Sequence, residues 1–229
     1  MSVDNRLKKI AGMVSVGSTV ADIGTDHAYL PVFLVKEGIV SKAFACDVVD
    51  GPLENARINI LKSGVSGITV RKGDGLNAVK PFEADTFIIA GMGGELIARL
   101  LTDSPWIKNE KYELILQPMT AVEDLREYLC RNGFEITLEQ AVKSQGRIYT
   151  VMKVRFCGKV TDCSPLFYFF GKLIDTIGED ELVYINRKRR IIKELAEDIN
   201  GIESQQVKYN RVVEEIAEID KILGCTNGN

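Results

Sequence analysis

Three aspartates are spaced so that together they could hold a nucleoside. Asp22, Asp47 and Asp74 each stand at the end of a short apolar run, and Asp47 comes 25 residues after Asp22. Because α/β proteins bind ligands at the edge where the carboxyl ends of parallel strands meet, we expect the three carboxylates to share that edge. There, Asp47 can accept hydrogen bonds from ribose hydroxyls, and Asp74, beside Gly75, can accept one from an adenine amino group.

The number of glycines in the turn after the first strand indicates which class of nucleoside cofactor could bind there. Asp22 is followed by Gly24, which lets the chain turn tightly beside a ligand, but residues 22–31 contain no second glycine. A dinucleotide cradle of the G-x-G-x-x-G type needs more glycines. The loop therefore favours a cofactor without a pyrophosphate, such as S-adenosylmethionine, although a plain strand–turn–helix with a capping aspartate would have the same residues.

A second glycine-rich bend follows the fourth apolar run. It begins with Ala90 and Gly91, and three of the four residues in 91–94 are glycines. Such a bend needs positive φ or a close approach of the backbone to a ligand. We place it where a target base would approach the transferable methyl group, and the polar strand end at residues 116–119 lies beside the same edge. The alternative is an ordinary glycine turn before a helix.

The alternation of apolar runs with amphipathic stretches predicts a parallel sheet with helices between its strands. We expect a leading helix over 5–13, strands over 19–23, 42–47, 68–72, 85–90 and 112–117, and helices over 29–37, 52–62, 94–102 and 122–132. Residues 134–142 and 148–156 are rich in β-formers and predict an antiparallel hairpin. Five parallel strands and a terminal hairpin are typical of the seven-stranded, Rossmann-like sheet of class I methyltransferases.

Beyond Gly158 the pattern changes from strands to helices. We predict one helix over 166–177 and two longer ones over 180–199 and 205–223, which share an apolar seam as an antiparallel αα-hairpin. The chain is therefore expected to contain a methyltransferase domain over 1–158 and a helical, coiled-coil-like, RNA-binding appendage over 159–229.

Composition excludes several other classes of protein. The five cysteines form no C-x-x-C pair and there is one histidine, which argues against a zinc site or a disulfide framework, so no metal is expected. No run of about 18 apolar residues and no signal-peptide core is present, so we expect a cytoplasmic protein without a membrane span. A net charge of −3 means that any RNA must meet local basic patches.

Five short blocks occur together in one order. They are Asp-Ile-Gly-Thr-Asp-His-Ala-Tyr-Leu-Pro (22–31), Asp-Gly-Pro (50–52), Gly-Asp-Gly-Leu (73–76), Ile-Ala-Gly-Met-Gly-Gly (89–94) and Leu-Gln-Pro (116–118). In these blocks the chain resembles the bacterial TrmK family over essentially its whole length. The resemblance implies methylation of N1 of the adenine at position 22 of tRNA, with S-adenosylmethionine as methyl donor. Met119 departs from the pattern, because asparagine is expected there.

The implied reaction depends on aligning the substrate with the cofactor more than on acid–base catalysis. Adenine N1 carries an in-plane lone pair and needs no deprotonation, so the enzyme must bring N1, the methyl carbon and sulfur nearly into line. We predict that Asp26 positions the cofactor's ammonium or the adenine amino group and that Tyr29 stacks on the extruded base. His27 is a third candidate, although a lone histidine is more often a structural hydrogen-bonding group.

Swinging a stacked adenine out of tRNA costs a few kcal/mol, which a basic surface must supply. The candidates lie near the N-terminus, beside the hairpin turn and on the helical appendage: Lys8, Lys9, Lys143, Arg147, Arg187, Lys188, Arg189 and Arg190. A solvated helix face is the alternative for the last four, since acidic residues follow closely. Whether the chain is a monomer or a weak dimer stays open.

Two other functions fit parts of the sequence. A nicotinamide-dependent oxidoreductase would also use Asp47 for a ribose, but the sparse first loop and the terminal hairpin speak against it. A non-catalytic RNA-binding protein would use the αα-hairpin alone, but it would have no need for three carboxylates at the strand ends.

Overall fold

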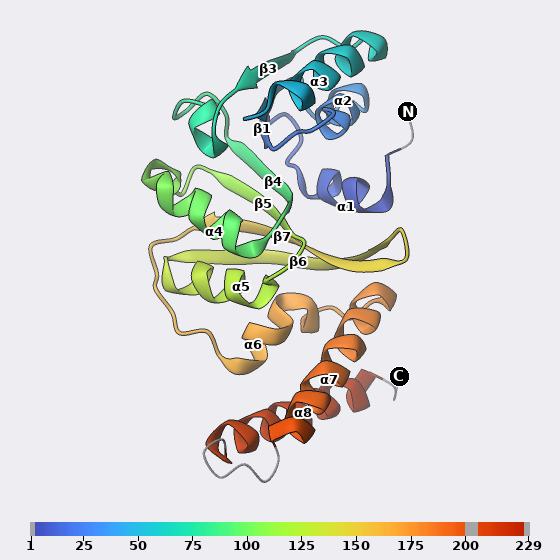
Figure 1. The fold of residues 1–229 in the computed structure, drawn as a ribbon, viewed down its shortest axis with the longest axis vertical. Coiled ribbons are helices and arrows are strands. Elements are labelled where there is room, and N and C mark those ends of the chain that lie inside the picture. Colours follow the sequence, from blue (N-terminus) through green and yellow to red (C-terminus); the bar gives the residue numbers. More distant parts are fainter. Residues whose placement is uncertain (1–2, 200–205, 227–229) are drawn as a thin grey trace.

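The computed structural model describes residues 3–199 and 206–226. At its centre is a seven-stranded sheet in the order β3-β2-β1-β4-β5-β7-β6 (Figure 1). β1 to β5 run parallel, and β6 and β7 form an antiparallel hairpin whose β7 pairs with β5. This confirms the predicted seven-stranded, Rossmann-like sheet. The strands are β1 (Thr19–Ile23), β2 (Lys42–Asp47), β3 (Ile68–Lys72), β4 (Thr86–Met92), β5 (Glu113–Pro118), β6 (Phe134–Ser144) and β7 (Arg147–Phe156).

Helices cover both faces of the sheet, because the strands are apolar on both sides. One face carries α1 (Asn5–Met13), α2 (Tyr29–Lys36) and α3 (Asp50–Ser63); the other carries α4 (Gly94–Asp103), α5 (Val122–Arg131) and the short 3-10 turns η1 (Gly75–Ala78) and η2 (Pro105–Ile107). The helix predicted over 52–62 begins two residues earlier, because Val49 is the last residue with extended backbone (φ −102°, ψ 137°).

Successive side chains of a strand point to opposite faces of the sheet, and this determines which of them lie on the side covered by α1. Val20, Ile88 and Ile115 pack in the apolar cluster under α1 and α2. Side chains two positions further along a strand return to the same face. The α1 face of the central strands therefore ends in Asp22 on β1, Ala90 on β4 and Gln117 on β5, which gives this corner of the sheet its polar character.

The hairpin is longer than its sequence suggested. Ser144 pairs with Arg147, so the turn consists of Gln145 and Gly146 alone. Both residues have positive φ, 50° and 75°, as expected for a two-residue turn whose twist matches the strands. The predicted five-residue connection over 143–147 is therefore wrong by three residues, because β6 and β7 pair as far as Ser144 and Arg147.

The C-terminal region is helical, as predicted, and lies along β6 and α5 (Figure 1). It comprises α6 (Pro165–Phe170), the 3-10 turn η3 (Gly171–Ile174), α7 (Glu179–Ile199) and α8 (Gln206–Thr226). α7 and α8 pack side by side on an apolar cluster that includes Phe170, Ile185 and Ile219. No helix in the described ranges combines the length and hydropathy that crossing a membrane requires.

A buried ion pair joins this helical region to the sheet. Arg126 of α5 and Glu139 of β6 are fully buried and lie 2.8 Å apart. Arg126 also donates to the carbonyl oxygens of Tyr168 and Phe169, at 3.0 and 2.8 Å. The Glu139 carboxylate also accepts hydrogen bonds from the Thr150 hydroxyl and the Lys172 main-chain N–H.

The same cluster explains a failed prediction. Residues 166–177 were expected to form one helix, but the chain breaks at Gly171, where φ is +55°. A Cβ at this position would overlap the Glu139 carboxylate and the Arg126 guanidinium. The break is therefore imposed by residues far away in the sequence.

Candidate active site

The turn between β1 and α2 contains three residues with left-handed backbone. Gly24, Asp26 and Ala28 have φ values of 78°, 51° and 55°. The turn is held against β2, because the main-chain N–H groups of Gly24 and Thr25 both donate to the Cys46 carbonyl, at 2.8 and 2.9 Å. Backbone strain of this kind costs about 1–3 kcal/mol at each non-glycine residue and concentrates at ligand-binding sites.

Asp22 is buried at the foot of this turn. Its side chain is 6% exposed and accepts a hydrogen bond from the Thr25 hydroxyl at 2.6 Å. Burial raises the pKa of Asp22 to about 6, although the Thr25 hydroxyl and the positive charge of Arg6 act in the opposite direction. The protein therefore keeps a poorly solvated carboxyl group near the carboxyl end of β1.

The bend after β4 is a bulge centred on Gly91. The register with β5 shifts between Ala90 and Met92, and Gly91 has φ of +78°. The side-chain carbonyl oxygen of the fully buried Gln117 accepts the Gly91 N–H at 3.1 Å. Gly94 begins α4 so close to the Ala121 carbonyl that a Cβ there would overlap it. Both glycines are therefore required by local geometry.

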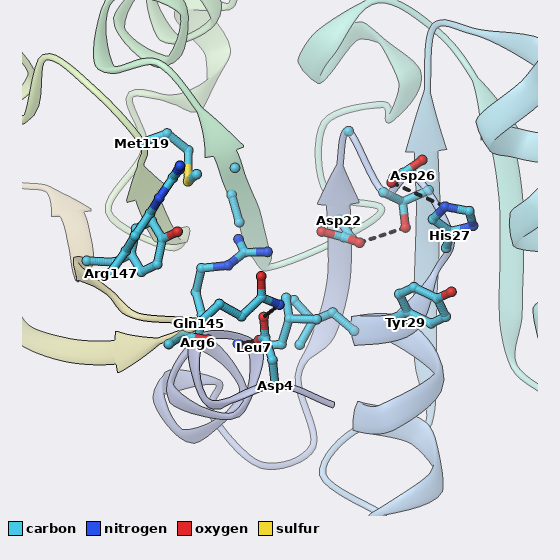
Figure 2. Close-up of a pocket in the computed structure, with 17 residues that line it drawn as sticks. Asp4, Arg6, Leu7, Asp22, Asp26, His27, Tyr29, Met119, Gln145 and Arg147 are labelled. Carbon is cyan, nitrogen blue, oxygen red and sulfur yellow. Dashed lines mark hydrogen bonds and ion pairs between the residues drawn. The ribbon is translucent and has the colours of Figure 1, made fainter. Parts of the chain in front are cut away.

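A cavity of about 450 Å³ lies between the β1 turn and the β4 bulge (Figure 2). Its walls come from the N-terminus of α1, the β1 turn, the ends of β4 and β5, and the hairpin tip. Eight predicted site residues line it: Asp22, Gly24, Asp26, His27, Tyr29, Ala90, Gly91 and Arg147. The cavity opens where strand order reverses between β1 and β4, the usual ligand position in open α/β sheets.

Asp47, Asp74 and Gly75 lie at the same sheet edge but outside this cavity. The Asp47 carboxylate accepts the Val49 N–H at 2.9 Å, and the Gly73 N–H donates to the Asp47 carbonyl at 3.0 Å, so the second and third strand ends are joined. Asp74 is exposed and lines a separate hollow of about 280 Å³ next to α4. The three aspartates therefore follow the rim of the sheet, with Asp22 inside the cavity, Asp47 half-buried outside it and Asp74 exposed.

Two rings are stacked on the cavity wall. The His27 and Tyr29 ring centroids are 5.1 Å apart with 21° between their planes. The His27 Nε2 lies 3.5 Å from the Asp26 carboxylate, and the Asn59 amide donates to the His27 carbonyl at 3.0 Å. Tyr29 is 38% exposed, so this pair presents a flat, partly open aromatic surface to the cavity.

Several lining residues were not predicted from the sequence. Arg6 reaches the cavity from α1, and Gln145 and Tyr149 reach it from the hairpin. Nothing in the local sequence signals them, because only the packing of α1 and the hairpin over the strand ends brings them there. Met119 also lines the cavity, where its sulfur accepts a hydrogen bond from the Gln117 amide at 3.5 Å.

The predicted basic residues fall into two groups. Lys8 and Lys9 line a shallow hollow between α1 and β6, and the exposed Lys143 and Arg147 flank the hairpin turn next to the cavity. The Asn5 side chain donates to the Lys143 carbonyl at 3.4 Å, which ties this turn to α1. Of these four residues, Arg147 lines the cavity itself, Lys143 lies on the hairpin beside it, and Lys8 and Lys9 line the separate hollow.

The basic run on α7 is distributed differently. Lys188 pairs with Glu123 of α5, and Arg189 pairs with Asp220 of α8. Arg190 lies 3.8 Å from Glu194 on the same helix. Two of the four cations are thus engaged in contacts between helices, while Arg187 and Arg190 are exposed.

The chain is similar to known methyltransferases. Residues 3–152 match a family model described as a methyltransferase domain. Over 153 residues the chain is 39% identical to the tRNA (adenine(22)-N(1))-methyltransferase of Bacillus subtilis. This alignment covers 66% of the chain and 64% of the relative, so it spans less than two thirds of that protein.

Solved structures extend the similarity to nearly the whole chain. The B. subtilis m1A22 tRNA methyltransferase TrmK superposes with a TM-score of 0.79 at 30% identity, covering 97% of each chain. Streptococcus pneumoniae Sp1610 superposes with a TM-score of 0.83 at 32% identity, covering 97% of this chain and 100% of the other. A complex of Sp1610 with S-adenosyl-L-methionine gives a TM-score of 0.77 at 31% identity, covering 95% and 98% of the two chains.

Proposed function

This chain belongs to the TrmK family of methyltransferases, and we propose that it transfers a methyl group from S-adenosylmethionine to N1 of an adenine in tRNA, at position 22. The observation that carries this proposal is the single cavity wall formed by the β1 turn, the β4 bulge and the His27–Tyr29 ring pair. It provides the Asp22 carboxyl group, a glycine-rich bend and an aromatic face in one place.

The residues at the sheet edge suit the cofactor. When bound, S-adenosylmethionine supplies a methyl group that is already electrophilic on its sulfonium. The buried Asp22 carboxylate offers a counter-charge within the cavity, and the open rim beyond it offers Asp47 for a ribose and Asp74 for an adenine amino group. Gly24, Gly75, Ala90 and Gly91 would let the backbone approach closely.

The substrate adenine then needs only correct placement. N1 attacks with its own lone pair, so the protein must orient the base and exclude misaligned approaches. Tyr29, stacked on His27, offers a face on which an extruded base can lie, and stacking of this kind contributes about 1–3 kcal/mol for each base. Asp26 lies next to this pair and is positioned to accept a hydrogen bond from an amino group.

We assign RNA binding to the cations on α1, at the hairpin turn and on the appendage. Lys8, Lys9, Lys143 and Arg147 can contact phosphates close to the flipped base. On α7, the exposed Arg187 and Arg190 are more accessible to RNA than Lys188 and Arg189, which pair with acidic residues of neighbouring helices, although Arg190 also lies 3.8 Å from Glu194 on its own helix. We place the catalytic unit in 1–158 and the appendage in 159–229, and expect a cytoplasmic protein.

The proposal is tested by nucleoside mass spectrometry. Unmodified tRNA is incubated with the full chain and isotope-labelled S-adenosylmethionine, digested and analysed. A labelled 1-methyladenosine peak, lost when A22 is replaced, is expected. Label on another base or atom would contradict the proposal. Asp26→Ala serves as the active-site variant, with cofactor affinity measured separately.

A thermal-shift comparison separates the proposal from an oxidoreductase. S-adenosylhomocysteine should raise the melting temperature of the protein, and NAD should not. A shift with NAD alone would favour the oxidoreductase, and no shift with either would favour a non-catalytic RNA-binding protein.

A further inference from the structure

Three cysteines that are far apart in the sequence gather near the carboxyl end of α5. Cys130 lies in the last turn of this helix, and Cys157 and Cys163 lie in the segment over 157–164, which leads from β7 to α6 (Figure 1). The Thr161 main-chain N–H donates to the Cys130 carbonyl at 3.0 Å, so the segment is held against α5. All three thiols are free, and none of them lines the cavity between the β1 turn and the β4 bulge.

A second cavity, of about 550 Å³, opens beside these thiols. Phe134 and Ile136 of β6 and Phe167 of α6 give it an apolar wall, and Cys130 and Cys157 also line it. Cys130 is only 9% exposed, so this cavity is the way by which a small molecule can reach it. Its apolar wall favours the entry of an uncharged molecule over a charged one.

Cys130 and Cys163 differ in their readiness to lose a proton. The Cys163 thiol donates a hydrogen bond to the Cys130 sulfur, so the two side chains are already in contact. This hydrogen bond, with a weaker one from the Thr161 side chain, outweighs burial and lowers the pKa of Cys130 to about 7. The same contact, together with burial, raises the pKa of Cys163. Near neutral pH, Cys130 therefore supplies a nucleophilic thiolate, and a neutral thiol lies beside it.

The charged groups around the pair do not account for this difference. Glu127 raises the pKa of both thiols, and Arg126 lowers that of Cys163. The other charged residues that line the cavity carry two charges of each sign: Glu135, Lys159, Asp162 and Lys172. The hydrogen bond between the two sulfurs is therefore the main cause of the reactivity expected for Cys130.

Two other cysteines lack this arrangement. The Cys157 thiol donates to the Gly133 carbonyl at 3.5 Å, so its partner is main chain and not a second thiol. Cys46 is fully buried inside the sheet, and burial raises its pKa to about 12. Cys157 therefore provides a control in the same cavity, and Cys46 one in the core.

We propose that Cys130 and Cys163 form a reversible redox site, in which hydrogen peroxide oxidises the two thiols to a disulfide. The Cys130 thiolate attacks one peroxide oxygen and displaces hydroxide, which leaves a sulfenic acid on Cys130. The Cys163 sulfur then attacks the Cys130 sulfur, loses its proton and releases water. In total, the two sulfurs lose two electrons and the peroxide becomes two molecules of water. A thiol reductant restores both thiols.

The disulfide would join α5 to the segment that leads into the helical appendage. The loop that it closes contains β6 and β7, so it would restrict the unfolded chain and stabilise the protein. Both cysteines lie outside the cavity assigned to methyl transfer, so the inference goes beyond the proposed function and does not depend on it.

Peptide mapping of the full chain tests the inference. The protein is treated with hydrogen peroxide at pH 7, its remaining thiols are alkylated, and it is digested without reduction. We expect a linked pair of peptides through Cys130 and Cys163, two hydrogens lighter than the separate peptides and absent after dithiothreitol treatment. The oxidised protein should melt about 5 °C or more above the reduced one. A link from Cys130 to Cys157, a link between two chains, or oxidation of Cys130 without any link would overturn the inference.

Two variants separate the roles of the thiols. Cys163→Ser should form no internal link and should leave a sulfenic acid on Cys130, which dimedone traps. Cys157→Ser is the matched control, because it changes a thiol in the same cavity, and it should form the link at the wild-type rate. Equal slowing in both variants would overturn the inference. The wild-type peptide map needs no variant, so it is decisive even where Cys163→Ser fails to fold.

The pH dependence of alkylation gives an independent readout. The rate at which iodoacetamide modifies Cys130 in wild-type protein should rise with pH through a midpoint at about 7, because the thiolate is the reacting form. In Cys157→Ser the midpoint should stay there. A wild-type midpoint at about 8.5, the value of an ordinary thiol, would contradict the role given to Cys163 as hydrogen-bond donor.

Discussion

Replacement of Asp22 by asparagine should make the empty protein more stable and the enzyme worse. Burial raises the pKa of Asp22 from 3.8 to about 6. At about 1.4 kcal/mol for each factor of ten in the proton dissociation constant, the charged carboxylate costs the folded state up to about 3 kcal/mol at pH 8. Asparagine keeps an oxygen for the Thr25 hydroxyl but buries unpaired amide hydrogens, which cost about 1 kcal/mol. The expected net gain is about 2 kcal/mol.

The sign of the pH dependence provides the stricter test. A carboxyl group whose pKa is raised by folding binds its proton more readily in the native state, so its contribution to stability falls as pH rises from about 4 to about 6. At pH 4.5 the cost of Asp22 shrinks to about 1 kcal/mol, and the gain from Asp22→Asn should nearly vanish. Urea unfolding followed by circular dichroism at pH 8 and pH 4.5 measures both quantities.

Asp47→Asn is the control for this experiment. It removes the same charge from the next strand end, but the Asp47 side chain is only half-buried and accepts the Val49 N–H, so no gain in stability is expected. The reasoning is refuted by an Asp22→Asn protein that is no more stable than wild type at pH 8, or by a gain that persists undiminished at pH 4.5. S-adenosylhomocysteine should raise the melting temperature of the variant less than that of wild type.

Four further results are expected. Arg126→Met should lower the free energy of unfolding by about 3–5 kcal/mol, since it leaves the Glu139 carboxylate buried without its partner; in urea melts, a loss below about 1 kcal/mol would contradict this. Gly94→Ala should destabilise the protein and abolish methylation because its Cβ has no room, and near-wild-type melting and turnover would show that α4 can shift. Tyr29→Phe should retain most tRNA affinity while Tyr29→Ala should lose about tenfold or more in filter binding, and equal loss in both would argue against stacking. Arg187→Glu should weaken tRNA binding and reduce its salt slope by about one, and an unchanged slope would remove this part of the appendage from the RNA surface.

The sheet was predictable because each strand carries its own local signal. The first three strands have the predicted bounds, and the glycines that end the helices before β2, β3 and β6 have positive φ. The strand-end aspartates could be assigned to one edge for the same reason, since parallel topology alone places them there. Local pattern and global fold agree over most of residues 1–158.

Prediction failed where distant residues decide local structure. Gly171 breaks a helix because Glu139 and Arg126 occupy the space of its missing side chain, and neither is near it in sequence. Arg6 went unnoticed because an arginine in an N-terminal helix has no special pattern, and only the docking of α1 over the strand ends makes it part of the cavity. All four cations of the basic run on α7 were considered as RNA-binding candidates. In the structure, Lys188 and Arg189 form ion pairs with neighbouring helices.

The Arg126–Glu139 cluster bears on how this molecule could be divided. A chain ending after residue 158 would lose the Tyr168 and Phe169 carbonyls and the Lys172 N–H that complete the cluster. The Arg126 guanidinium and the Glu139 carboxylate would then be exposed to solvent, because the C-terminal helices no longer cover β6 and α5. The C-terminal helices therefore help to stabilise the sheet. A catalytic fragment that ends after residue 158 would need a redesigned surface on β6 and α5 in order to fold by itself.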